Sequence, residues 1–193
     1  MAIHTALQGG ALPQGHIRIT APDDFGHLLL LNELQAFGTL WPDITFEIDL
    51  SNRYVDLVRE GYDLAIRAAP AAAVPGANDL ITRKLLSSEL YIAGSPSNSQ
   101  RIASLESLSE QPISVSGRFV VHDYSSMASL IAQGAGFGLI PRMHIDHSQG
   151  ALTCVLPGYS SAPSNIALVY PSRQLPRRVS LLIEHLSRRL GDS

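Results

Sequence analysis

Two stretches near the start of the chain alternate apolar with polar residues, at positions 17–21 and 44–50. Alternation with a period of two is typical of a β-strand with one buried face. Between them, leucines and Phe37 recur at three- and four-residue spacing after Pro22. This spacing predicts an amphipathic helix that ends at Gly38 and the Trp41-Pro42-Asp43 turn. The first third of the chain therefore begins as strand, helix, strand.

A second helix and a third strand are predicted directly afterwards. Ser51-Asn52 is expected to cap a short helix over residues 54–60, and Gly61 to end it before the apolar run 64–66. Strands that alternate with helices imply parallel pairing through right-handed crossovers. This order predicts an open α/β sheet with helices on both faces.

The same alternation stops and then restarts further along the chain. Residues 80–94 are expected to be extended chain that crosses elsewhere. A strand at 118–121, a capped helix at 125–133 and a strand at 138–140 follow. These predict a second, smaller α/β lobe.

The end of the chain is expected to return to the first lobe. A strand at 166–170 precedes an arginine-rich helix at 177–190 whose aliphatic residues form one stripe, and this helix should pack on the first lobe. Glycine and proline make residues 1–14 a predicted linker. Lobe I is assigned to residues 15–93 and 168–193, and lobe II to residues 94–167.

Composition narrows the classes of protein that this chain can represent. Its 193 residues are 45% hydrophobic with a formal net charge of −3, so roughly 70% of the unfolded surface can be buried without disulfides. The single cysteine, Cys154, suits a reducing compartment, and no export signal is seen at the start, so the expected location is cytoplasmic. The longest apolar runs are far below the roughly 20 residues that span a membrane. The acidic balance argues against a surface that grips nucleic acid.

The sequence carries no recognisable catalytic constellation, so the chain is not expected to be an enzyme, and no cofactor or metal is expected. It lacks a Gly-x-Ser-x-Gly elbow. His144 and His147 could form a metal pair, but no third ligand follows at a matching spacing. The glycine-rich stretch 134–138 follows a helix and contains no lysine, so it predicts a helix stop and a tight turn rather than a phosphate loop.

Polar residues follow the predicted strands at 21–25, 51–53 and 122–126. Ligands of open α/β sheets bind outside the carboxyl ends of the strands, where helix N-termini present free N–H groups. Two interpretations remain open here. Each group either caps its own helix, or the three groups together line a cleft for a small polar molecule.

A series of ordered motifs resembles the effector-binding domain of LysR-type transcriptional regulators. The most specific block is Glu60-Gly61-Tyr62-Asp63-Leu64-Ala65-Ile66-Arg67; the others are Gly15 to Pro22, Trp41-Pro42, Leu50 to Arg53, Thr82 to Leu85, Gly94-Ser95-Pro96, Val115 to Arg118, Gly134 to Gly138 with Ile140-Pro141, and Tyr170 to Arg173. The series covers nearly the whole chain. Between Pro96 and Val115, however, the chain is shorter than the family pattern.

The resemblance implies a two-lobed fold like that of type II periplasmic binding proteins, each lobe an open mixed sheet flanked by helices. It implies an effector in the interlobe cleft, no catalysis, a homodimer that becomes a tetramer in the full-length regulator, and DNA contact only through a helix-turn-helix preceding Met1, which this sequence lacks. An antiparallel dimer would use apolar surface left by Leu28, Leu31, Leu34 and Phe37 and by the helix at 177–190. The alternative is a solute-binding protein of a transport system, which the missing export signal disfavours.

The residues expected to line the cleft come from the resemblance and from strand-end geometry. They are Asp23, Asp24, Ser51, Arg67, His122, Ser125 and Ser126. The two serines at 125 and 126 offer hydroxyls and backbone donors for a carboxylate, and the two aspartates suit a cationic or hydroxyl-bearing end. His122 could make affinity depend on pH near neutrality. For Arg67 the alternative is an ion pair with a neighbouring carboxylate that fixes the strand end.

Overall fold

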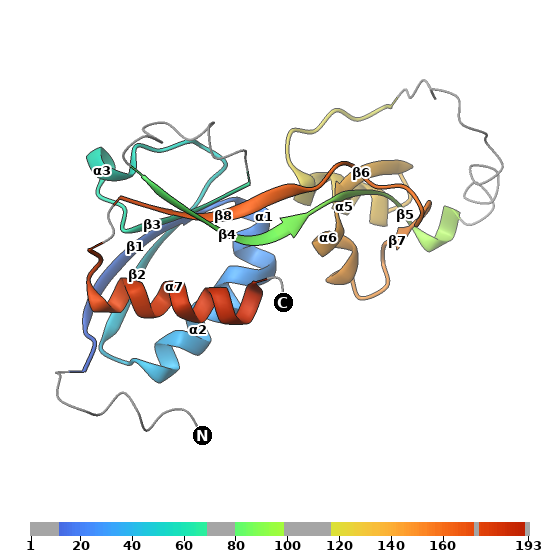
Figure 1. Ribbon diagram of the computed structural model, residues 1–193. Coiled ribbons are helices and arrows are strands. Elements are labelled where there is room, and N and C mark those ends of the chain that lie inside the picture. The colour runs from blue at the N-terminus through green and yellow to red at the C-terminus, as the bar shows by residue number, and fades with distance from the viewer. Residues whose placement is uncertain (1–11, 69–79, 99–116, 172–173, 192–193) are drawn as a thin grey trace. The chain divides into compact units, whose positions relative to one another are not determined.

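The computed structural model describes residues 12–68, 80–98, 117–171 and 174–191, and these form two compact units (Figure 1). Unit 1 comprises residues 1–86 and 166–193, and unit 2 comprises residues 87–165. The sequence placed these boundaries at 93/94 and 167/168. Most of the predicted linker, residues 1–11, lies outside the described residues.

Unit 1 contains a five-stranded sheet in the order β2-β1-β3-β8-β4. Its strands are β1 Gly15–Ala21, β2 Ile44–Leu50, β3 Leu64–Ala68, β4 Ile81–Ser88 and β8 Ser164–Tyr170. Strand β1 pairs in parallel with both β2 and β3, as predicted, and β3 pairs antiparallel with β8. The sheet is therefore mixed.

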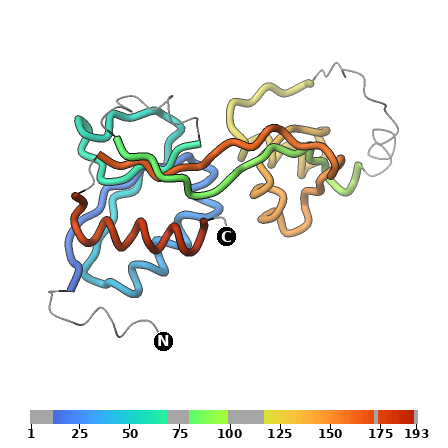
Figure 2. Tube along the Cα trace, in the orientation of Figure 1, coloured from blue at the N-terminus to red at the C-terminus, as the bar shows by residue number. Residues whose placement is uncertain are grey.

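The predicted first helix is one continuous helical stretch with three sections. It consists of α1 Asp23–Phe25, the π-helical η2 Gly26–Leu30 and α2 Leu31–Leu40. The C-terminal helix α7 spans Arg177–Leu190 as predicted and contacts α2 and β1, so it packs on unit 1 (Figures 1 and 2).

The apolar surface expected for a dimer is largely used inside unit 1. Leu34 is 3% exposed and Phe37 is 1% exposed, and α7 buries its apolar stripe as well. The expectation that these residues leave free apolar surface is therefore wrong for Leu34, Phe37 and the buried face of α7, because the two helices cover each other.

Helix α3 begins later than predicted, at Leu57, and ends at Glu60. Its N-cap is Asp56 rather than Ser51-Asn52, because the Asp56 carboxylate accepts a hydrogen bond from the Arg59 N–H. In return, the Glu60 carboxylate accepts from the Asp56 N–H over 3.1 Å, which resembles a capping box. Gly61 ends the helix with a left-handed φ of 74°, as predicted.

Unit 2 contains a smaller sheet in the order β6-β5-β7, with both pairings antiparallel. The strands are β5 Leu90–Gly94, β6 Phe137–Pro141 and β7 Thr153–Cys154, and the helices are η5 Pro96–Asn98, α5 Tyr124–Ala132 and α6 Arg142–Asp146. Ala93, Ile131, Ile140 and Leu152 form its core.

One predicted strand is not formed. Residues 118–121 are irregular chain and pair with no strand in the part of the protein that the structure describes. Phe119 is 55% exposed and Val120 is 84% exposed. The pattern was that of a strand, but β hydrogen bonds need a neighbouring strand, and none is described beside it.

Candidate functional site

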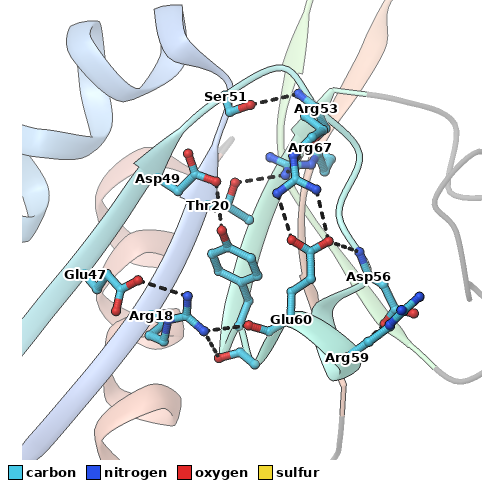
Figure 3. Close-up of polar contacts among 12 residues, drawn as sticks. Arg18, Thr20, Glu47, Asp49, Ser51, Arg53, Asp56, Arg59, Glu60 and Arg67 are labelled. Carbon is cyan, nitrogen blue, oxygen red and sulfur yellow. Dashed lines mark hydrogen bonds and ion pairs between the residues drawn. The ribbon is translucent and has the colours of Figure 1, made fainter.

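The carboxyl ends of three parallel strands meet at one edge of the sheet in unit 1. Ala21 lies opposite Leu50 in the pairing of β1 with β2, and Thr20 lies opposite Ala65 in the pairing of β1 with β3. Figure 3 shows the polar side chains that gather there, including those of Thr20, Asp49 and Arg67. This is the position at which open α/β sheets bind ligands.

Arg67, at the end of β3, is the buried cation of this edge. It is 5% exposed, and its guanidinium donates to Ile66 O over 2.8 Å, to Thr20 Oγ1 over 2.9 Å and to Arg53 O over 3.1 Å. All three acceptors are uncharged, so within the described residues no carboxylate accepts a hydrogen bond from Arg67. Burial lowers the pKa of Arg67, and the nearby Asp49 charge opposes that shift.

Asp49 is held by a tyrosine from the most specific motif. The Tyr62 hydroxyl donates to Asp49 Oδ2 over 2.8 Å, and this hydrogen bond, together with burial, raises the pKa of Tyr62. No hydrogen bond joins Asp49 to Arg67 among the described residues, and the Asp49 charge acts on the Arg67 guanidinium by electrostatic attraction.

Arg53 is fixed by a two-pronged ion pair with Glu60. Its guanidinium contacts Glu60 Oε1 at 3.1 Å and Glu60 Oε2 at 2.7 Å (Figure 3), and this lowers the pKa of Glu60. Because the Arg53 carbonyl accepts from Arg67, the ion pair also steadies one of the acceptors around the buried guanidinium. Glu60 thus links the start of α3 to the edge of the sheet.

Arg18 joins the same motif to β1 from the middle of the sheet. It donates to Glu47 Oε1 over 2.9 Å and to the carbonyls of Glu60 and Gly61, and its guanidinium carbon lies 4.9 Å from the centre of the Tyr62 ring. Sequence reasoning did not single out Arg18. Arg18 lies opposite Glu47 on the neighbouring parallel strand, and this pairing of opposite charges could have identified it.

Ser51, Asp23 and Asp24 make local contacts in unit 1. Ser51 Oγ accepts from the Arg53 N–H over 3.1 Å. Asp24 Oδ1 accepts from the Phe25 N–H over 2.8 Å, and Asp23 Oδ1 lies 3.5 Å from His27 Nε2. Each of the three is half-buried, so it retains surface for a further partner.

In unit 2, the start of α5 is capped by a residue that the prediction missed. Asp123 Oδ1 accepts from the Ser126 N–H over 2.7 Å, and hydrogen bonds from the helix start lower the pKa of Asp123. The Ser126 backbone donor is therefore not free, contrary to expectation. His122 and Ser126 are exposed and Ser125 is half-buried. The preference of aspartate for the N-cap could have identified Asp123.

The seven predicted site residues divide between the units. Asp23, Asp24, Ser51 and Arg67 belong to unit 1, and His122, Ser125 and Ser126 belong to unit 2. That they line one cleft remains a prediction. Within the described residues, no group of three His, Cys, Asp or Glu side chains could hold a metal ion. No described helix is long and apolar enough to cross a membrane.

Comparison with known proteins identifies one family. The family model described as LysR substrate binding domain matches residues 10–113 and 97–191. The HTH-type transcriptional regulator PtxR of Pseudomonas aeruginosa is 28% identical over 210 residues, which is 96% of this chain and 67% of PtxR. Since the chain has only 193 residues, the matched stretch of PtxR includes residues that this chain lacks. The two family matches overlap at residues 97–113, inside the segment that the sequence predicts to be short.

Solved structures show the same fold. The regulatory domain of CrgA from Neisseria meningitidis is similar with a TM-score of 0.77 and 20% identity, covering 93% of this chain and all of that one. The effector binding domain of AmpR from Citrobacter freundii has a TM-score of 0.75 and 19% identity, covering 92% of this chain and 98% of that one. The predicted α/β fold with two sheets is confirmed.

Proposed function

The chain belongs to the LysR substrate-binding domain family of transcription regulators, and from that premise we propose that it senses a small polar effector carrying an anionic group. The family is one of regulators rather than enzymes. The proposed binding residues are Asp23, Asp24, Ser51 and Arg67 at the strand ends of unit 1 and His122, Ser125 and Ser126 at the start of α5 in unit 2.

The buried Arg67 guanidinium carries this proposal. Among the described residues, this cation is removed from water and hydrogen-bonded to neutral oxygens. It gains from an anionic partner, because bonds between two charged groups are stronger than bonds to neutral acceptors. The half-buried aspartates on α1 suit a hydroxyl or ammonium group instead. A small carboxylic acid that also bears a hydroxyl or amino group fits both.

Dimerisation and DNA regulation belong to the proposal as well. The chain spans about two thirds of PtxR, and we infer that it works in the cytoplasm as the sensing part of an oligomeric regulator whose DNA contacts come from a helix-turn-helix. The effector acts only if it binds one arrangement of the protein better than the other. No observation favours the alternative, a transport protein.

A thermal-shift screen of hydroxy and amino carboxylic acids tests the effector site. A true effector at 100 times its dissociation constant stabilises the protein by about 2.7 kcal/mol. Arg67→Gln and Ser126→Phe should each abolish that shift, and Arg142→Gln, which removes an exposed arginine paired with Asp146, should retain it.

Two variants are needed because Arg67→Gln can lose effector binding through a loss of stability alone. If Arg67→Gln lowers the melting temperature without ligand, the exposed Ser126→Phe decides, because that residue lies outside every core cluster described. A full response to a confirmed effector in both variants would place the pocket elsewhere.

A further inference from the structure

The two units share part of one plan. In unit 1, β3 follows a helix and pairs antiparallel with β8, which neighbours β4; in unit 2, β6 follows a helix and pairs antiparallel with β5, which neighbours β7. Unit 1 then continues beyond β3 with β1 and β2. Within the described residues, the sheet of unit 2 stops at β6.

A hollow lies on this side of β6, entirely within unit 2. Its volume is about 350 Å³, and its walls come from residues 117–121, from α5 and from β6. Residues 117–121 precede α5 and β6 just as β2 precedes α3 and β3 in unit 1. Among the described residues, the hollow therefore lies between residues 117–121 and β6, as β1 lies between β2 and β3 in unit 1. It is a concave surface that is open to solvent.

The floor of the hollow is closely packed. A Cβ added at Gly138 of β6 would lie 2.8 Å from Ile131 Cδ1 and 2.9 Å from Met127 Sδ, so α5 already sits against β6 as closely as it can. Next to this floor, Leu139 is 45% exposed and Phe119 is 55% exposed. Apolar surface that lies exposed around a concave site gains free energy when a ligand covers it.

One charged side chain borders the hollow. Arg118 is exposed, and it forms no hydrogen bond or ion pair with any residue that the structure describes. Ligand pockets combine a mostly apolar lining with a few polar groups that fix orientation, in volumes from about 300 Å³ upward. A single arginine at an apolar wall therefore favours one anionic group on an otherwise apolar molecule.

We propose that this hollow is a second binding site, for a small apolar molecule that carries one anionic group. The apolar body covers exposed apolar residues of the lining, Phe119 and Leu139, and the anionic group pairs with Arg118. The site uses other residues than the proposed effector site, because its lining includes none of His122, Ser125 and Ser126.

Two dyes that differ by one sulfonate test the proposal with the full chain. The anionic dye 1-anilinonaphthalene-8-sulfonate should bind once per chain, and Leu139→Asp should weaken the binding of this dye and of uncharged N-phenyl-1-naphthylamine by roughly tenfold or more. Arg118→Gln should weaken only the anionic dye, by roughly fivefold to tenfold. Val58→Asp, at a 67% exposed apolar residue of unit 1, is the matched control and should change neither.

Four results would overturn the proposal. Binding of several dyes per chain, or binding that survives Leu139→Asp, would mean that the dye reports general apolar surface. If Arg118→Gln weakens the binding of both dyes equally, Arg118 does not recognise an anionic group on the ligand. Failure of dye binding together with a dimer that Leu139→Asp dissociates in sedimentation would make the hollow an interface between two copies. If an effector still stabilises the Leu139→Asp variant against heat, the proposed effector site is intact. Any of the results above then counts against the second site alone.

Discussion

The sheets of the two units show how strongly a central strand affects the burial of side chains. In unit 1, β1 has a neighbour on each side, and Ile17, Ile19 and Ala21 are fully buried. In unit 2, β6 has one described neighbour, and Leu139 keeps 45% of its surface exposed. Both units contain a helix followed by a strand that pairs with an antiparallel neighbour. Strand β6 also supplies the fully buried Ile140 to the core of unit 2, so a strand with one described neighbour buries one face and leaves the other open. Such an edge is available for binding.

The largest expected difference between the units is in the cost of removing a strand side chain. Ile19→Ala should lower the free energy of unfolding by about 2–5 kcal/mol, because it leaves a cavity in a closed core. Leu139→Ala should change it by less than about 0.5 kcal/mol, because the residue is half in water. Urea unfolding of both variants measures the difference, and similar losses would contradict the contrast between core and edge.

A medium effect is expected from two glycines that allow close packing. A Cβ at Gly26 would overlap Leu50 Cδ2 and lie 2.7 Å from Leu50 Cδ1, so Gly26→Ala should cost about 1–3 kcal/mol. Gly138→Ala meets Ile131 Cδ1 at 2.8 Å and the flexible Met127 at 2.9 Å, so it should cost about 1 kcal/mol, less than Gly26→Ala. Thermal unfolding compares the two. A larger loss for Gly138→Ala would show that unit 2 is packed as rigidly as unit 1.

The smallest effect concerns acid stability, with one carboxylate from each unit. Arg53 lowers the pKa of Glu60 below its ordinary 4.5, and the helix start lowers that of Asp123 below its ordinary 3.8. A carboxyl group whose folded pKa is lowered stabilises the protein above its unfolded pKa, and this is lost as pH falls through the folded value.

Glu60→Gln and Asp123→Asn should therefore each destabilise slightly at pH 7 and flatten the decline in unfolding midpoint below those ordinary values. Glu184→Gln, at an exposed residue of α7, is the control and should follow the unaltered protein. An unchanged acid decline in both variants would mean that neither contact differs between the folded and unfolded chain.

Periodicity in the sequence predicted the elements but not their neighbours. Strands β1, β2, β3 and β8 and helix α7 follow from apolar spacing, since that spacing states which face is buried. Residues 118–121 have the same kind of spacing and form no strand, because pairing depends on a partner that local pattern does not reveal.

For the candidate site, the sequence likewise predicted residues but not their hydrogen-bond partners. Arg67 follows from the family motif, whereas its partners, Thr20 and the Arg53 carbonyl, depend on strand register and on where α3 begins. Ser126 was identified as a donor, but Asp123, three residues earlier, already accepts from its N–H. Neighbouring polar groups compete for the same hydrogen-bond partners. Residue type alone does not predict which of them forms the bond.

The division of unit 1 into two stretches of sequence has a consequence for protein synthesis. Strand β8 lies between β3 and β4, and α7 covers α2, yet both are translated after the whole of unit 2. On the ribosome, unit 2 can therefore fold while β4 still has no neighbour and α2 still exposes Leu34 and Phe37. A nascent chain in that state presents an unpaired sheet edge and an apolar helix, and both features make an incompletely folded chain prone to aggregation.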